Sequence, residues 1–140
     1  MLPNLSDMKK LIVLLLACAM GTACFAQSAK QESRKNLVVK EWNRGDGGKG
    51  ARFLDHVTKY NADGRKSEDI EYTSSGAMKT RCTYEYDANG KVSREVVYNE
   101  HNKAVRIRKF EYNTDGTKKK QYNYAPNGKL QSVKEFEYVR

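Results

Sequence analysis

The chain has 140 residues, of which 26 are Lys or Arg and 17 are Asp or Glu, so its formal net charge is +9. This length suits a single domain and excludes a large multidomain enzyme. After position 26 only 17 residues are Leu, Ile, Val or Phe, and a share of about 15% is too small for a membrane bundle or a thick apolar core.

Residues 1–26 have the pattern of an export signal. Two lysines precede an apolar run over residues 11–20, and small residues lead to Ala26. A positive start, a short apolar run and small residues before a cleavage point are typical of a signal peptide. We therefore predict cleavage after Ala26 and an exported protein, either periplasmic or secreted. Lipoprotein anchoring at Cys18 or Cys24 is the alternative.

Cleavage at this point has two consequences for the mature chain. The apolar run is too short to span a membrane and is removed, so we expect no transmembrane segment after cleavage. Two of the three cysteines are also removed, which leaves Cys82 alone. A single cysteine forms neither an intramolecular disulfide nor a cysteine metal site. We interpret Cys82 as a small buried apolar residue, with a bridge between two chains as the alternative.

The segment that follows the signal leads into a single domain. Residues 27–35 are polar, and we predict a flexible tail there. Apolar residues at 37–39 and 52–54 predict two strands, joined by a glycine-rich loop over residues 45–50. From residue 36 to residue 140 we expect one β-repeat domain.

Tyrosines recur at a regular spacing through most of this domain. Successive tyrosines lie alternately 12 and 14 residues apart, and each of the first six is followed four residues later by Gly or Asn. An internal period of this kind marks a repeat architecture, here a unit of 26 residues with two turns, over residues 58–138. The tyrosines are Tyr60, Tyr72, Tyr86, Tyr98, Tyr112, Tyr124 and Tyr138.

The residues between the tyrosines predict hairpin turns. Asp87-Ala88-Asn89-Gly90 begins with Asp and ends with Gly, which suits a type I turn followed by a left-handed residue. Five further segments have the same pattern or a weaker form of it. Six such turns in succession predict an all-β fold, an antiparallel meander of about seven to eight strands in a single-layer or curled open sheet.

A symmetric register from each turn would give this sheet one aromatic face, because side chains alternate between the two faces along a strand. The same register places opposite charges across from one another on the other face, where each pair would contribute about 0.2–1 kcal/mol. The predicted pairs are Tyr86–Val92, Tyr84–Arg94 and Cys82–Val96 on the aromatic face, and Glu71–Lys79, Asp69–Arg81, Arg65–Glu85 and Glu111–Lys119 on the charged face.

The aromatic face is the candidate binding surface. Aromatic rings with basic neighbours bind sugars, anionic glycans or a partner's surface. In the alternative, the tyrosines form the only available core and the basic side chains extend from it into solvent. The candidate binding residues are Tyr84, Tyr98, Tyr112, Tyr122, Arg94 and Arg108.

The sequence offers no catalytic or metal-binding pattern. His56 and His101 have no His or Cys partner at the spacing of metal ligands, and neither a nucleophile elbow nor a Cys–His signature is present. We therefore expect no metal, no cofactor and no catalytic residue. A pocket that holds His56 against a carboxylate would instead favour a small hydrolase.

The segment Tyr86-Asp87-Ala88-Asn89-Gly90-Lys91-Val92 resembles the tyrosine-aspartate (YD) repeat of Rhs-type secreted proteins. The stretches that begin at Tyr60, Tyr112 and Tyr124 match it more loosely, so that the resemblance covers residues 52–140. It implies β-hairpins that, in the family, spiral into shells around toxins or bind carbohydrate; about three units are too few to close a shell. The chain also resembles short signal-bearing bacterial proteins of unknown function, and its hairpins are similar to antitoxin-type MORN-like repeats.

These patterns together favour a non-enzymatic exported protein that binds or scaffolds at the bacterial cell envelope. The alternatives are a secreted module that binds carbohydrate or anionic glycan and, more distantly, a small hydrolase. The expected partners are a second copy that covers the aromatic face, a glycan, or an anionic envelope component such as a lipid headgroup. The basic charge also suits nucleic acid, but export makes that partner unexpected.

Overall fold

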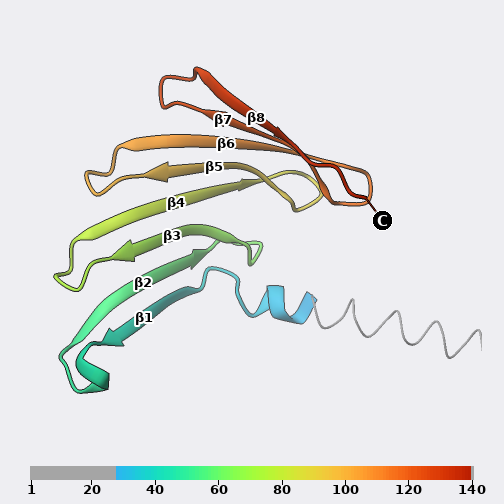
Figure 1. The fold of residues 1–140 in the computed structure, drawn as a ribbon. Coiled ribbons are helices and arrows are strands. Elements are labelled where there is room, and N and C mark those ends of the chain that lie inside the picture. Colours follow the sequence, from blue (N-terminus) through green and yellow to red (C-terminus); the bar gives the residue numbers. More distant parts are fainter. Residues whose placement is uncertain (1–27, 140) are drawn as a thin grey trace, which may run out of the picture.

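The computed structural model describes residues 28–139 and contains one antiparallel sheet of eight strands in meander order. The sheet is a single open layer, with β1 and β8 at its opposite edges (Figure 1). The predicted all-β meander is therefore confirmed. The strands are β1 (Val38–Arg44), β2 (Arg52–Tyr60), β3 (Lys66–Tyr72), β4 (Met78–Tyr86), β5 (Val92–Tyr98), β6 (Ala104–Tyr112), β7 (Lys118–Tyr124) and β8 (Leu130–Glu135).

The turns have the predicted chemistry. In the turn after β4, Gly90 donates its N–H to the carbonyl of Asp87 at 3.0 Å, and the Asp87 N–H bonds to the carbonyl of Lys91 at 2.9 Å. Gly90 has a φ of 76°, and Asn102, which replaces glycine in the turn after β5, has a φ of 57°. These left-handed positions explain why Gly or Asn ends each turn.

The register differs from the predicted one because each of the six turns between β2 and β8 is followed by a β-bulge. Tyr86 lies opposite Val92 as predicted, but the next pair is Glu85 with Arg94, so Ser93 is an extra residue in β5. A bulge reverses the alternation of side chains along the strand that carries it. The extra residues of the six hairpins are Ser67, Lys79, Ser93, Val105, Lys119 and Gln131.

As a result, the prediction of a single aromatic face does not hold. We name the two sides by adjacent residues of β3: the Asp69 face includes Thr58, Asp69 and Cys82, and the Glu68 face includes Lys59 and Glu68. Of the tyrosines that precede turns, those of β2, β4 and β6 lie on the Asp69 face, and those of β3, β5 and β7 lie on the Glu68 face.

The same bulges rearrange the predicted ion pairs. Glu71 and Lys79 do meet, at 2.6 Å, but Glu85 pairs with Arg94 at 2.5 Å and not with Arg65. The other predicted partners are also exchanged: Arg81 pairs with Glu68, and Lys120, the Cα partner of Glu111, pairs with Glu135.

The core is thin and lies in the middle of the sheet. Val57, Ile70 and Val96 are buried on the Glu68 face, and Thr58 and Val97 on the Asp69 face. Burial then decreases toward the edges, and every residue of β8 is exposed. The sheet is held mainly by its ladders and by contacts between side chains of neighbouring strands.

A short helical segment lies beside one end of the sheet. Residues 28–32 form this segment, and turns lead from it into β1, whereas a flexible tail was predicted over residues 27–35. The side chain of Gln31 donates to the carbonyl of Asp63 at 2.7 Å, and the Asn36 N–H donates to the carbonyl of Asn61 at 3.0 Å. Within residues 28–139 no helix has the length and apolar character needed to cross a membrane. The predicted signal peptide and its two cysteines lie outside the described residues.

Candidate functional site

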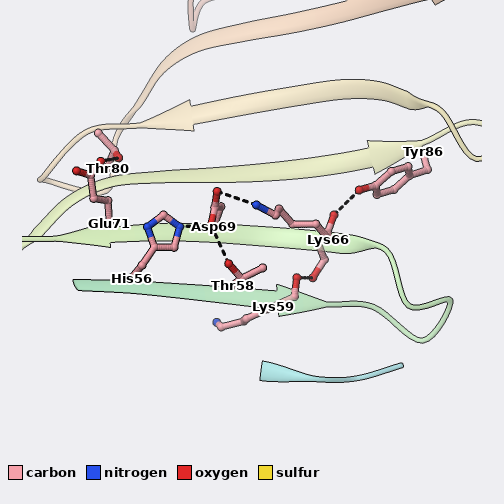
Figure 2. A network of polar contacts seen from close by, with 9 residues as sticks. His56, Thr58, Lys59, Lys66, Asp69, Glu71, Thr80 and Tyr86 are labelled. Atoms are coloured by element: carbon pink, nitrogen blue, oxygen red, sulfur yellow. Dashed lines mark hydrogen bonds and ion pairs between the residues drawn. The ribbon is translucent and has the colours of Figure 1, made fainter. Parts of the chain in front are cut away.

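A polar cluster around Asp69 occupies the Asp69 face of β2 and β3 (Figure 2). His56 and Thr58 are two residues apart on β2, so both point to this face, where Thr58 lies directly opposite Asp69. One oxygen of Asp69 accepts from Thr58 Oγ1 at 3.1 Å and contacts His56 Nε2, and the other pairs with Lys66 Nζ at 3.1 Å. We call these four residues the Asp69 cluster.

The contacts of Asp69 keep its carboxylate charged. Burial opposes ionisation, but the hydrogen bonds from His56 and Lys66 and the positive charge of Lys66 outweigh it, so the pKa of Asp69 is lowered. Its two oxygens are shared among three donors, and little acceptor capacity is left for an incoming ligand.

The cluster includes the His–carboxylate contact that would favour a hydrolase, but it lacks an activated nucleophile. The hydroxyl of Thr58 donates to Asp69 and not to His56. Cys82 lies on β4, directly opposite Asp69. Burial, together with the charge of Glu95, raises the pKa of the Cys82 thiol, which disfavours the reactive thiolate. The geometry thus assigns His56 and Asp69 to a structural cross-strand pair.

Sequence reasoning missed the His56–Asp69 contact because the symmetric register assigned Asp69 to Arg81. The bulge at Ser67 places Thr58 opposite Asp69 and so brings His56 to the diagonal position, and the sequence carries no signal for that bulge. Within residues 28–139 no group of three or more His, Cys, Asp and Glu side chains is arranged to hold a metal.

A second cluster lies on the Glu68 face. Glu68 pairs with Lys59 and accepts from Arg81 Nη1 at 2.8 Å. Arg81 also lies over the ring of Tyr98, with its guanidinium carbon 3.9 Å from the ring centre. Burial raises the pKa of Glu68, but the hydrogen bonds from Lys59 and Arg81 exceed that effect and lower it. The two clusters are therefore internal networks on opposite sides of one strand.

The six predicted binding residues are divided between the two faces. Tyr84, Tyr112 and Arg108 lie on the Asp69 face, where Glu95 separates Tyr84 from Arg108 in one cross-strand row. The other three lie on the Glu68 face, where Arg94 and Tyr122 flank Lys109, and Tyr98 lies further along β5. The structure thus forms two groups of three and not one surface.

Five of these six side chains also have a partner within the sheet, and the sixth, Tyr84, is half-buried. Arg108 pairs with Glu95 at 2.6 Å and Arg94 with Glu85 at 2.5 Å. Burial raises the pKa of Tyr84. Tyr112 donates to the carbonyl of Val92 at 2.8 Å, Tyr122 donates to Glu111 at 2.8 Å, and Tyr98 lies under Arg81.

Cations cover most of the tyrosine rings that precede turns. Each ring faces a guanidinium or ammonium group from a neighbouring strand or turn, a geometry that contributes about 0.5–1 kcal/mol at exposed sites. The ring surfaces are thus already occupied on one side, as expected of rings that serve as a core. The pairs are Arg34–Tyr60, Arg65–Tyr86, Arg81–Tyr98, Lys91–Tyr112 and Lys109–Tyr124.

A shallow hollow of about 640 Å³ lies between the turns that follow β4 and β6. Its lining includes Asp87 and Asp115, whose carboxylates accept hydrogen bonds from backbone N–H groups of their own turns. Because these acids are used to shape the turns, the hollow does not form a set of convergent free ligands.

No model of a known protein family matches the chain, and no curated protein matches it. Among solved structures, the GtfA/B complex bound to UDP and GlcNAc has 17% sequence identity and a TM-score of 0.32, with 67% of this chain and 19% of that chain covered. A mutant of TarM from S. aureus, solved with fondaparinux, alpha-GlcNAc-glycerol and UDP, has 13% identity and a TM-score of 0.28, covering 81% of this chain and 22% of that one. Similarities this weak, over so small a share of those chains, carry no argument about activity.

Proposed function

We propose that the chain is a non-enzymatic, exported β-repeat protein that binds an anionic component of the bacterial cell envelope. The observation that supports this proposal is the charge of the Asp69 face over β6–β8. Arg106, Lys118 and Lys134 lie on this face and are exposed. The carboxylates of these three strands, Glu111 and Glu135, lie on the opposite face. We call these three cations the basic patch.

The basic patch differs from the neighbouring cations of the same face in its charge pairing. None of its three cations forms an ion pair with the described residues, whereas Lys66 and Arg108 on the same face are paired with Asp69 and Glu95. Phe110 lies beneath Lys118, 4.8 Å from its ammonium nitrogen. A set of cations beside an aromatic ring suits the charged headgroups of an anionic lipid surface, where each Lys or Arg contributes about 1 kcal/mol.

The alternative functions have less support. A glycan-binding module would use free ring faces, but cations from the same chain lie over the rings of Tyr98 and Tyr112. A hydrolase would need a nucleophile next to His56, and neither Thr58 nor Cys82 has that role in the Asp69 cluster.

Vesicle binding tests the proposed function. The protein recovered from expressing cells is titrated with vesicles of anionic phospholipid, and with zwitterionic vesicles for comparison. Its mass also shows whether it begins at Gln27, as signal cleavage requires. We expect binding to the anionic vesicles only, weakened about 100-fold in the triple variant R106Q/K118Q/K134Q, because three contacts of about 1 kcal/mol each are lost.

A matched triple variant controls for net charge. Lys30, Arg44 and Lys49 are exposed residues in the helical segment, in β1 and in the loop after β1, toward the opposite edge of the sheet from β6–β8. Their replacement by Gln removes the same charge without changing the basic patch. We expect this control to lose less than about tenfold in affinity, since its charges lie away from the patch. Equal losses in both triple variants, or equal binding to both kinds of vesicle, would contradict the proposal.

A further inference from the structure

The two edges of the sheet carry nearly all of its large exposed apolar side chains. Of nine such residues in the described chain, Val105 alone lies on an interior strand. The others lie in β1, in β8 or in the residues next to them. Single exposed apolar residues are ordinary, but their concentration along two unpaired strand edges marks surfaces suited to pair with another strand. They are Leu37, Val38, Trp42, Leu130, Val133, Phe136, Tyr138 and Val139.

At one equivalent position in each repeat, two residues of opposite charge lie opposite one another on neighbouring strands. Where an even-numbered strand meets the next strand, the Cα partners are Lys59 and Glu68, then Glu85 and Arg94, then Glu111 and Lys120. The next member of the even series is Glu137, 26 residues after Glu111. Glu137 forms no ion pair with the described residues, because no strand follows β8 in the sheet.

Strand β1 has the position and charge that would complete this series. Lys40 lies opposite Val57, as Glu68 lies opposite Thr83 one repeat later, so Lys40 is the first member of the odd series that includes Glu68, Arg94 and Lys120. On its outer side β1 has no neighbouring strand.

Trp42 provides a second indication at the same edge. Trp42 lies two residues after Lys40, as Ile70 lies two residues after Glu68 and Val96 two residues after Arg94. Ile70 and Val96 are only 8% and 5% exposed, because strands flank them on both sides. Trp42 has a strand on one side only and is 46% exposed. A strand added along β1 would cover the edge beside Trp42 as neighbouring strands cover its two equivalents.

We infer that copies of this chain associate head to tail, with β8 of one copy pairing antiparallel with β1 of the next and Glu137 lying opposite Lys40. This contact continues the meander without a change in strand direction or register. It joins two different surfaces, so each added copy presents a free edge to a further one, and the assemblies grow with concentration until a ring closes or as an open filament. The inference does not depend on envelope binding, since it uses the edges of the sheet and not the basic patch.

Charge exchange between the two edges tests the inference. Sedimentation velocity is measured over a range of protein concentrations at low ionic strength, where charge pairs are least screened. The wild-type protein is expected to form dimers and larger species. K40E and E137K each place like charges opposite one another and should raise the dissociation constant about tenfold or more, whereas the double variant K40E/E137K should restore association.

Mixing provides a second readout. K40E and E137K proteins are each expected to be monomeric alone and to associate when combined, because each then supplies the charge that the other lacks. Lys103→Glu and Glu100→Lys make the same changes of charge in a turn away from both edges and should associate as the wild type does. Circular dichroism of every variant is the check that each one is folded.

Three results would overturn the inference. The first is a wild-type protein that stays monomeric at every concentration. The second is association that K40E and E137K leave unchanged, which would indicate another interface, such as a dimer through one face. The third is a double variant or a mixture that fails to associate although both single variants are folded.

Discussion

At the scale of single residues, Asp69 is the side chain on which the most contacts converge. It accepts from Thr58 and Lys66 and contacts His56, so that it connects β3, which also carries Lys66, to β2. Removal of its charge leaves donors on three residues without an ionised acceptor, and such a loss at a partly buried site is costly.

We therefore expect Asp69→Asn to lower the free energy of unfolding by about 1–3 kcal/mol. The measurement is denaturant unfolding followed by circular dichroism. Glu71→Gln is the matched control, because Glu71 lies on the same strand and face but its side chain is 41% exposed and pairs with an exposed Lys79. The control should cost less than about 1 kcal/mol, and an equal effect of both substitutions would contradict the assigned role of Asp69.

The lowered pKa values of Glu68 and Asp69 predict a pH dependence of stability. A carboxyl group whose pKa is lower in the folded state stabilises the fold above its unfolded pKa, about 4.3 for Glu and 3.9 for Asp. That contribution is lost as the pH falls through the folded value. Unfolding measured between pH 7 and pH 2 should show a decrease in stability below about pH 5, and the decrease should be smaller in E68Q/D69N.

At the scale of elements, the turn after β2 differs from the others because the helical segment packs on it. A Cβ added at Gly64 would lie 1.9 Å from the carbonyl oxygen of Gln31, and Gly64 has a φ of +71°. Gly76, in the next turn, has a φ of +87° but no neighbouring atom within 4 Å of such a Cβ. The two glycines share the conformational requirement, and only Gly64 has the additional contact.

Gly64→Ala is therefore expected to destabilise the protein more than Gly76→Ala. The positive φ costs each variant about 1 kcal/mol, and the collision with the backbone of Gln31 adds to the cost at Gly64. Thermal unfolding compares the two variants, and NMR of the Asn36 amide reports whether the helical segment has moved. Equal losses of stability would indicate that residues 28–36 do not pack on this turn in solution.

The bulges explain which parts of the fold could be predicted from sequence. Gly and Asn at the turns have a direct conformational cause, so the strands and their order followed from the spacing of the tyrosines. The extra residues of the bulges share no chemistry: Ser67, Lys79 and Val105 occupy equivalent places in three hairpins. Without a residue preference at that place, the register and the faces of the candidate binding residues could not be predicted.

At the scale of the whole molecule, burial is concentrated in the middle of the sheet and decreases toward β8. Val57, Ile70, Val96 and Val97 are the buried apolar residues, and all lie in β2, β3 or β5. Since a strand opens more easily when few apolar contacts hold it, the sheet should open from its C-terminal edge.

Hydrogen exchange followed by mass spectrometry tests this expectation. At low protein concentration, amides of β3–β5 should exchange most slowly and those of β8 fastest. At high concentration, head-to-tail association would add protection to β1 and β8 together, because each then gains a neighbouring strand. Uniform protection across all eight strands would contradict the described distribution of burial.

The bulge after every turn also sets the unit by which such a sheet changes length. One hairpin turn reverses the direction of the chain, and the bulge next to it exchanges the face of the sheet on which equivalent side chains lie. Two turns restore both, so the gain or loss of 26 residues would leave every later strand in its original orientation. A change of half that length would exchange the two faces in the remainder of the sheet and so replace the cross-strand neighbours of its buried residues, which makes gene duplications of whole units the ones compatible with this fold.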